Sequence, residues 1–192
     1  DNIETFSYDI ITQVNDFTKE YFFIDIEKEI ENMKLPEIKN FIYEFLNRPI
    51  RVCGMIQNTG EPGGGPFFVK DEKGISLQIV ESSQIDMSDP VKKAIFDSST
   101  HFNPVNIVCT LKDREGKKID LKNFVDHEAY FIADKTYNGK KIKALELPGL
   151  WNGAMAKWLT VFVEVPISTF CPAKTVNDLL KKERFIKESN EA

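Results

Sequence analysis

A glycine-rich segment constrains this chain more than any other feature of its sequence. Residues 60–69 read GEPGGGPFFV, with three consecutive glycines between two prolines. Glycine permits positive φ angles and a close approach of the backbone to a ligand, while the prolines limit the freedom of the loop. The apolar run 77–80 is typical of a buried strand, and Glu81 follows it, where open α/β sheets place ligand-binding side chains. We therefore predict a binding site around Gly64, Gly65 and Glu81.

Composition and charge exclude several classes of protein. The 192 residues are 42% hydrophobic, which predicts a globular chain of one or two domains. The net charge of −5 argues against a general nucleic-acid binder, since such binding rests on Lys and Arg contacts to phosphate. An apolar run of membrane-spanning length is absent, and the N-terminus has no basic segment followed by an apolar one. We therefore expect a cytoplasmic protein with no membrane and no nucleic-acid partner.

The cysteines and histidines give no sign of a metal site. Cys53, Cys109 and Cys171 are odd in number and widely spaced, which argues against a disulfide framework or a zinc site. We predict reduced thiols in the core. His101 and His127 have no cysteine or carboxylate partner at ligand spacing, so we predict surface or capping roles for both.

Hydrophobic periodicity divides the chain into a helical section, residues 1–48, and an α/β section, residues 49–192. Helical spacing predicts one or two helices over 10–33 and a further helix over 38–46, with Pro36 near its first turn. The simplest interpretation of this section is a scaffold. Beyond it, strands are predicted at 51–56, 67–70, 77–80, 106–111, 130–133, 141–147 and 160–165, with helices at about 90–96 and 175–186.

The predicted fold class is α/β, a mixed β-sheet flanked by helices. We expect this sheet to be built around 51–56, 77–80, 106–111 and 160–165, the last as a central strand because its run is continuously β-branched and aromatic. Asn138-Gly139 predicts a tight hairpin. Ser88 or Asp89 before Pro90 predicts a capped helix start.

The order of several motifs resembles the C-terminal half of the UDP-sugar pyrophosphorylases, most closely the UDP-N-acetylhexosamine branch. These motifs are GPFFV (65–69), QIVESSQI (78–85), Phe102-Asn103, VFVEV (161–165) and FCPAK (170–174). The fold it implies is a partial nucleotidyltransferase-like fold. The region from about 48 to 180 also resembles a bacterial family known only as a domain of unknown function, whose longer members carry this region at their C-terminal end.

The pyrophosphorylase resemblance implies a set of site residues. The glycine loop and Glu81 would contact the sugar of a sugar-1-phosphate or UDP-sugar, and a carboxylate can accept hydrogen bonds from two hydroxyls. Asn103 would add a sugar contact, and Lys174 would be the catalytic cation near the phosphates. Residues lining the sugar pocket would be Trp151, Asn152 and Gly153, where Trp151 and Asn152 replace a Phe-rich stretch of the family. From its residue type alone, Trp151 is either a core aromatic or a ring that stacks on a sugar.

The same resemblance implies a missing nucleotide-binding half. That half would supply a glycine-rich loop, basic residues and an Asp that helps to hold Mg²⁺, and residues 60–65 match neither nucleotide-binding glycine pattern. No cofactor is therefore expected within this chain, and Mg²⁺ is expected for a complete enzyme. Completed, the protein would convert a sugar-1-phosphate and UTP to a UDP-sugar and pyrophosphate. The alternatives are a non-catalytic carbohydrate or nucleotide-sugar binding module, and a structural interaction domain that associates through residues 1–48.

Overall fold

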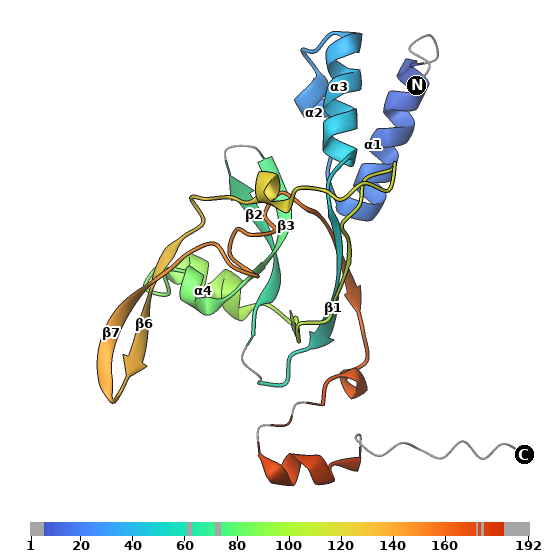
Figure 1. The fold of residues 1–192 in the computed structure, drawn as a ribbon. Helices are drawn as coiled ribbons and strands as arrows, with labels where there is room; N and C mark the ends of the chain where they lie inside the picture. The colour runs from blue at the N-terminus through green and yellow to red at the C-terminus, as the bar shows by residue number, and fades with distance from the viewer. Residues whose placement is uncertain (1–5, 61–62, 72–73, 172, 174, 183–192) are drawn as a thin grey trace, which may run out of the picture.

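The computed structural model describes residues 6–60, 63–71, 74–171, 173 and 175–182. Three helices lie at one end of the molecule, β-strands form its middle, and a long hairpin extends to one side (Figure 1). The described C-terminal segment lies at the end opposite the helices (Figure 1). The fold is thus mixed α/β, as the sequence predicts.

The helical end contains α1 (Tyr8–Phe22), α2 (Glu27–Ile30) and α3 (Leu35–Leu46). Pro36 lies in the first turn of α3, where its missing N–H removes no helical hydrogen bond. The inner faces of these helices form one hydrophobic cluster with the start of strand β8 (Leu159–Glu164). Its buried members are Ile11, Phe22, Ile26, Ile30, Ile38, Ile42, Phe45 and Leu159. This cluster attaches the helices to the sheet.

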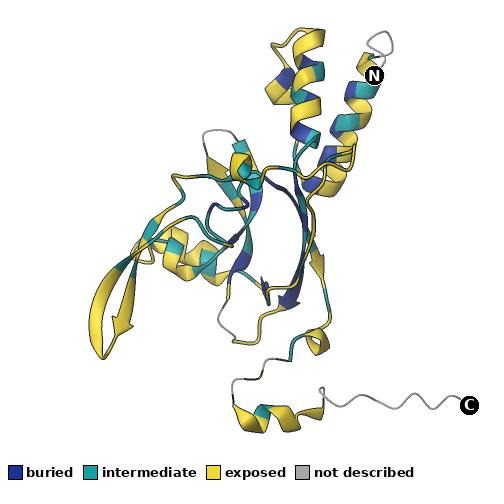
Figure 2. Ribbon diagram, in the orientation of Figure 1, coloured by how far each residue is buried: buried dark blue, intermediate teal, exposed yellow. Residues whose placement is uncertain are grey.

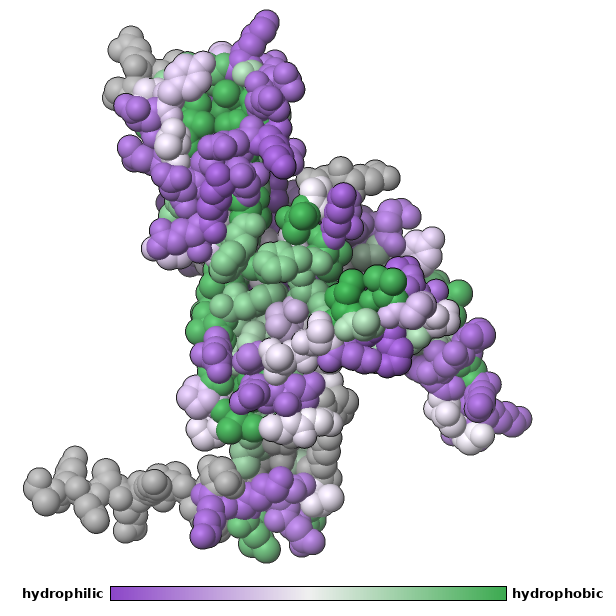
Figure 3. All heavy atoms as spheres, turned by 180° about the vertical axis from the view of Figure 1, so that it is seen from behind, coloured by the Kyte–Doolittle hydropathy of each residue, from purple (hydrophilic) through white to green (hydrophobic). Residues whose placement is uncertain are grey.

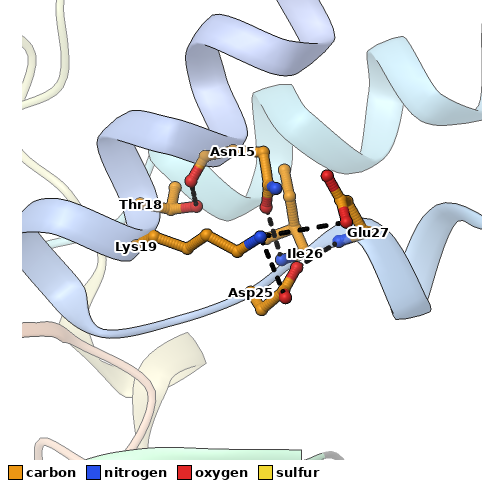
Figure 4. A network of polar contacts seen from close by, with 6 residues as sticks. All are labelled: Asn15, Thr18, Lys19, Asp25, Ile26 and Glu27. Atoms are coloured by element: carbon orange, nitrogen blue, oxygen red, sulfur yellow. Dashed lines mark hydrogen bonds and ion pairs between the residues drawn. The ribbon is translucent and has the colours of Figure 1, made fainter.

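A buried amide fixes the link between α1 and α2 (Figure 4). Asn15 is 1% exposed, and its Oδ1 accepts a hydrogen bond from the Ile26 backbone N–H at 2.9 Å. Lys19 on the surface pairs with Asp25 at 3.0 Å, and this hydrogen bond is the largest cause of the lowered pKa of Asp25. The Asn15 side chain thus supplies a hydrogen-bond acceptor for the buried Ile26 N–H in place of a backbone carbonyl.

Strand β1 (Ile50–Gln57) is the centre of the main sheet. On one side it pairs in parallel with β8 (Leu159–Glu164), with Val52 opposite Val161. On the other side it pairs antiparallel with β5 (Ile107–Thr110) and, at its end, with β4 (His101–Phe102). Among the described residues β8 pairs only with β1, so the predicted central position of 160–165 is wrong and β8 is an edge strand.

A second layer faces this sheet. Strands β2 (Gly65–Asp71) and β3 (Gly74–Val80) form an antiparallel hairpin, and Ile79 packs against Cys53 and Met55 of β1. The sequence predicts the run 77–80 in the main sheet, and this prediction is wrong, because β3 pairs with β2 instead. The apolar residues of this run are buried by packing across the layers, because the short link after β2 pairs β3 with its neighbour in the chain.

The burial of Cys53 between the layers has an electrostatic consequence. Burial raises the pKa of the Cys53 thiol to about 11, which keeps it protonated at neutral pH. Cys109 is exposed on β5, so the prediction of a core thiol is wrong for that residue. Figure 2 shows the same contrast at larger scale: buried residues lie on β1, on the facing strand and on the inner sides of the helices.

Local sequence signals account for the remaining elements. Helix α4 (Pro90–Asp97) begins after Asp89, whose Oδ1 accepts hydrogen bonds from the backbone N–H groups of Val91 at 2.9 Å and Lys92 at 3.2 Å. The hairpin of β6 (Phe131–Tyr137) and β7 (Lys140–Glu146) turns at Asn138 and Gly139, both with positive φ, as predicted. Short 3-10 helices are η2 (Ser82–Gln84), η3 (Leu121–Phe124), η4 (Ile167–Thr169) and η5 (Val176–Leu180). The predicted helix at 175–186 is thus a shorter 3-10 helix in the described part, and 183–186 lie outside the described residues.

Candidate functional site

The glycine segment lies where the two layers meet, and it needs glycine there. Gly65 is paired with Val80 at the open end of the β2–β3 hairpin. A Cβ on Gly64 would lie 2.5 Å from Ile79 Cγ2, and one on Gly65 would lie 2.7 Å from Ser99 Oγ. Neither position has room for a side chain. Gly64 and Gly65 are both buried, so the segment is packed on both faces there.

Glu81 follows β3 directly and lies against this segment. The Cβ position of Gly64 is 3.4 Å from Glu81 Cγ. The Glu81 backbone N–H donates to Gln84 Oε1 at 2.7 Å, which fixes the start of η2. The side chain is half-buried, and its carboxylate has no ion-pair partner in the part of the chain that the structure describes. It is available to accept hydrogen bonds.

Asn103, which follows β4, contacts the glycine segment through its backbone. The Asn103 N–H donates to the Gly64 carbonyl at 2.9 Å. Its side chain is 3% exposed; Nδ2 donates to the Gly54 carbonyl at 2.8 Å, and Oδ1 accepts from the Val105 N–H at 2.8 Å. Asn103 therefore holds the loop 103–106 against β1 and positions the glycine segment.

A cavity of about 390 Å³ opens beside the glycine segment. Asn58, which follows β1, and His101 on β4 contribute to its lining, and β8 ends at Glu164, whose Oε1 lies 3.6 Å from His101 Nε2. The cavity thus lies at the carboxyl ends of the parallel strands β1 and β8. Open α/β sheets bind ligands at this edge. The described lining is Asn58, Gly63, Gly65, Phe96, Asp97, Ser99, His101 and Phe102.

The cavity and Glu81 lie on opposite faces of the glycine segment. The Cβ position of Gly63 points at Phe102 and that of Gly65 at Ser99, whereas that of Gly64 points at Ile79 and Glu81. Successive residues of an extended chain alternate in this way. The glycine segment therefore lies between the cavity and Glu81.

The described lining suits hydroxyl groups better than phosphate. Asn58 and Ser99 offer an amide and a hydroxyl, and the carboxylate of Asp97 forms an ion pair with Lys93 of its own helix. The lining has no Lys or Arg among the described residues. Nor do the described residues contain a group of three His, Cys, Asp or Glu that could hold a metal ion.

The loop 151–153 lies on the main cluster and is held by its own turn. The Trp151 ring packs against the cluster of Cys53, Met55 and Ile79. Asn152 Nδ2 donates to the Leu147 carbonyl at 3.1 Å and to the Ala129 carbonyl at 3.2 Å.

Gly153 has a φ of +93°, and a Cβ there would lie 2.6 Å from Ala129 Cβ. Only glycine fits that backbone without strain. The described contacts of residues 151–153 are therefore those of a packed turn.

Lys174 and Pro172 lie outside the described residues. Phe170, four positions before Lys174, packs edge to face on Phe102 with 5.2 Å between ring centroids. Phe102 lines the cavity. Phe170 therefore lies beside the cavity wall.

Several lining residues could not be found from sequence patterns. Asn58, Asp97, Ser99 and His101 belong to no motif, and they meet because α4 and β4 fold back onto the end of β1. The position of Asn58 directly after a predicted strand is the one signal that could have identified it. Over the described residues, no helix is both long and apolar enough to cross a membrane.

The chain belongs to the family described as domain of unknown function (DUF4301), whose profile matches residues 2–184. No curated protein matches it. Its fold is similar to a mutant UDP-glucose pyrophosphorylase of Leishmania major in complex with UDP-glucose, at 19% identity and a TM-score of 0.42, over 74% of this chain and 32% of that one. A second structure of that enzyme matches at 19% identity and a TM-score of 0.39, again over 74% and 32%. This chain thus spans about a third of the length of these structures.

Proposed function

We propose that this chain is the C-terminal portion of a bacterial nucleotidyltransferase-like protein and binds the sugar-phosphate part of a UDP-sugar. One observation carries the proposal. A glycine segment, packed too tightly for side chains, lies at the carboxyl edge of the parallel β1–β8 pair, with a polar-lined cavity on one face and the Glu81 carboxylate on the other. Substrate binds at that edge in open α/β sheets.

The two faces suit two kinds of contact with a carbohydrate. Glu81 accepts hydrogen bonds from sugar hydroxyls, and Asn58 and Ser99 both donate and accept them. In this proposal the phosphate binds at the exposed Gly63 end of the glycine segment, and the Lys174 amine offsets its charge. Asn103 and the loop 151–153 support the glycine segment and its surroundings through the contacts described above. Trp151 packs against the cluster that contains Ile79, on the same face of the segment as Glu81.

If a nucleotide-binding half is present, this chain would take part in the transfer of a uridylyl group from UTP to the sugar-1-phosphate. An oxygen of the sugar-1-phosphate attacks the α-phosphorus of UTP, a new phosphorus–oxygen bond forms, and the bond to the leaving pyrophosphate breaks. This chain contributes positioning, which is the main source of catalysis in phosphoryl transfer. As the pyrophosphorylase resemblance implies, an Asp of the other half would help to hold Mg²⁺.

A second candidate is a binding module that senses a carbohydrate or nucleotide-sugar without catalysis. The absence of Lys and Arg from the described cavity lining favours it, because an enzyme that acts on pyrophosphate needs cations near the reacting phosphates. Pyrophosphate release from UTP and a sugar-1-phosphate, measured with the longest available chain, distinguishes the two. Release supports the enzyme, and binding without release supports the module.

Calorimetric titration with glucose 1-phosphate, N-acetylglucosamine 1-phosphate and their UDP-sugars tests the site. We expect Glu81→Ala to weaken binding about tenfold or more, because it removes a charged hydrogen-bond acceptor. Ser99→Leu, which fills the cavity, should also weaken it. Glu115→Ala is the matched control for the carboxylate, and Ser98→Leu, at an exposed neighbour of Ser99 that does not line the cavity, is the matched control for the serine. Unchanged affinity in both site variants would contradict the proposal.

A further inference from the structure

One buried polar atom at the cavity wall has no hydrogen-bond partner among the described residues. It is Nε2 of His101 on strand β4, and His101 lines the cavity beside the glycine segment. A buried polar atom without a partner is costly and uncommon in folded chains. The Glu164 carboxylate at the end of β8 is close to it, with Oε1 3.6 Å from Nε2. The two groups thus lie within ion-pair distance and just outside hydrogen-bond distance.

The His101 ring keeps its orientation in both charge states. Its Nδ1 lies 2.8 Å from Thr100 Oγ1. A threonine hydroxyl donates or accepts a hydrogen bond, so it pairs with this nitrogen whether or not the nitrogen carries a proton. The Glu164 backbone is fixed opposite Met55 in the register of β1 and β8, while its side chain is 76% exposed. The carboxylate can therefore approach Nε2 by rotation of its side chain alone.

Few other charged groups compete for this imidazole. Seen from behind, hydrophobic residues form a band across the middle of the molecule, between hydrophilic ends (Figure 3). On α4, the carboxylate of Asp97 lines the same cavity, but it is paired with a lysine of its own helix. Glu81 lies on the opposite face of the glycine segment, and β1 places the neutral Gln57 opposite His101. Among the described residues, Glu164 is therefore the carboxylate at ion-pair distance from His101.

The charge of the imidazole decides how strongly the pair binds. Histidine gains a proton as the pH falls from about 8 to about 5, and the imidazolium donates from both ring nitrogens. A hydrogen bond between charged groups is about twice as strong as one between neutral groups. Protonated His101 can donate from Nδ1 to Thr100 and from Nε2 to Glu164 at once. The pair is therefore stabilising at acidic pH, and this stabilisation is lost as the pH rises through the imidazole titration.

A bond in this pair would hold β4, which is attached to the sheet by a short register. β4 pairs with β1 at two positions, Ile56 with Phe102 and Gln57 with His101. Glu164 belongs to β8, which pairs with the opposite edge of β1. A bond between His101 and Glu164 therefore crosses the end of β1 and ties β4 to β8. His101 and Phe102 both line the cavity, so the bond holds one of its walls.

We infer that His101 and Glu164 form a pH-sensitive latch at the cavity. At acidic pH the imidazolium binds the carboxylate and fastens β4 to β8, and at alkaline pH the pair is released. The latch itself needs no ligand. Its consequence for binding rests on the proposed function: a wall that is already fastened costs less to order when a ligand binds, so the latch regulates the cavity by pH.

Thermal unfolding at about pH 5.5 and about pH 8 tests the latch in the 192-residue chain. Glu164→Gln keeps the shape of the side chain and removes its charge. We expect it to lower the melting temperature by about 3 °C at the acidic pH and by less than about 1 °C at the alkaline pH. Glu20→Gln, at an exposed position on α1, is the matched control and should have the same small effect at both. An equal loss at both pH values for Glu164→Gln overturns the inference.

The same substitution in a His101→Gln chain separates the pair from the charge of Glu164 alone. Without the imidazole, Glu164→Gln should have an equal effect at the two pH values. A pH dependence that persists in this background belongs to other groups and contradicts the inference.

Amide hydrogen exchange of the unaltered chain checks the fastening without any variant. The Asn58 N–H at the end of β1 donates to the Thr100 carbonyl beside β4 at 2.9 Å. We expect its protection factor to be at least about threefold higher at acidic than at alkaline pH. The Leu159 N–H, which donates to the Pro49 carbonyl at the other end of the β1–β8 pair, is the internal control and should not change.

An Asn58 protection factor that does not depend on pH overturns the latch. Neither readout uses a ligand. A failed sugar-phosphate titration therefore leaves these outcomes unaffected, and a failed latch leaves the proposed function as it stands.

Discussion

At the scale of single residues, the most consequential one outside the cavity is a buried arginine. Arg51 is 1% exposed, and burial lowers its pKa. Its Nε donates to Thr160 Oγ1 at 2.9 Å and its Nη2 to Gln78 Oε1 at 2.8 Å, and Gln78 Nε2 donates in turn to the Ala156 carbonyl at 2.9 Å. No carboxylate pairs with this guanidinium in the described part of the chain. The network therefore ties β1, β3 and β8 together through neutral acceptors.

Removing the acceptor should harm this network more than removing the charge. Gln78→Leu leaves the buried guanidinium with one acceptor fewer, and we expect it to lower the free energy of unfolding by about 3 kcal/mol. Arg51→Met removes the charge together with its desolvation penalty and should lower it by only about 1 kcal/mol. Urea unfolding followed by tryptophan fluorescence measures both, with Gln57→Leu at an exposed position as control. The opposite order would contradict this account of the network.

At the scale of elements, the helical end depends on one buried amide rather than on its surface charges. Asn15→Ala leaves the Ile26 N–H without a partner, and we expect a loss of about 2 kcal/mol in the free energy of unfolding. Lys19→Ala removes only exposed ion pairs from the same link and should change it little. Thermal unfolding by circular dichroism measures the two variants. Equal losses would mean that the surface pairs, not the amide, fix the link.

Elements with local signals could be predicted, and those that depend on distant partners could not. Asn138-Gly139 and Asp89-Pro90 specify their turn and helix start by backbone preference alone, and both occur as predicted. The partner of 77–80 and the edge position of 160–165 depend on long-range pairing, which no short pattern encodes. In the candidate site, the motif order indicated that Gly64, Glu81 and Asn103 belong together. It did not reveal that Asn103 is buried or that the cavity opens on the other face.

At the scale of the whole molecule, the proposed site lies at one edge of the main sheet. The carboxyl ends of β1 and β8 meet the glycine segment at the cavity. The proposed binding site thus lies at one end of the main sheet.

An NMR titration of the isotopically labelled 192-residue chain with N-acetylglucosamine 1-phosphate and glucose 1-phosphate tests most directly whether the glycine segment binds a sugar phosphate. We expect the backbone amide signals of Gly63, Gly64 and Gly65 to shift first, together with those of Glu81 and His101, which lie against the two faces of the segment. No shift with either compound, or shifts confined to a region away from the glycine segment such as the β6–β7 hairpin, would contradict it.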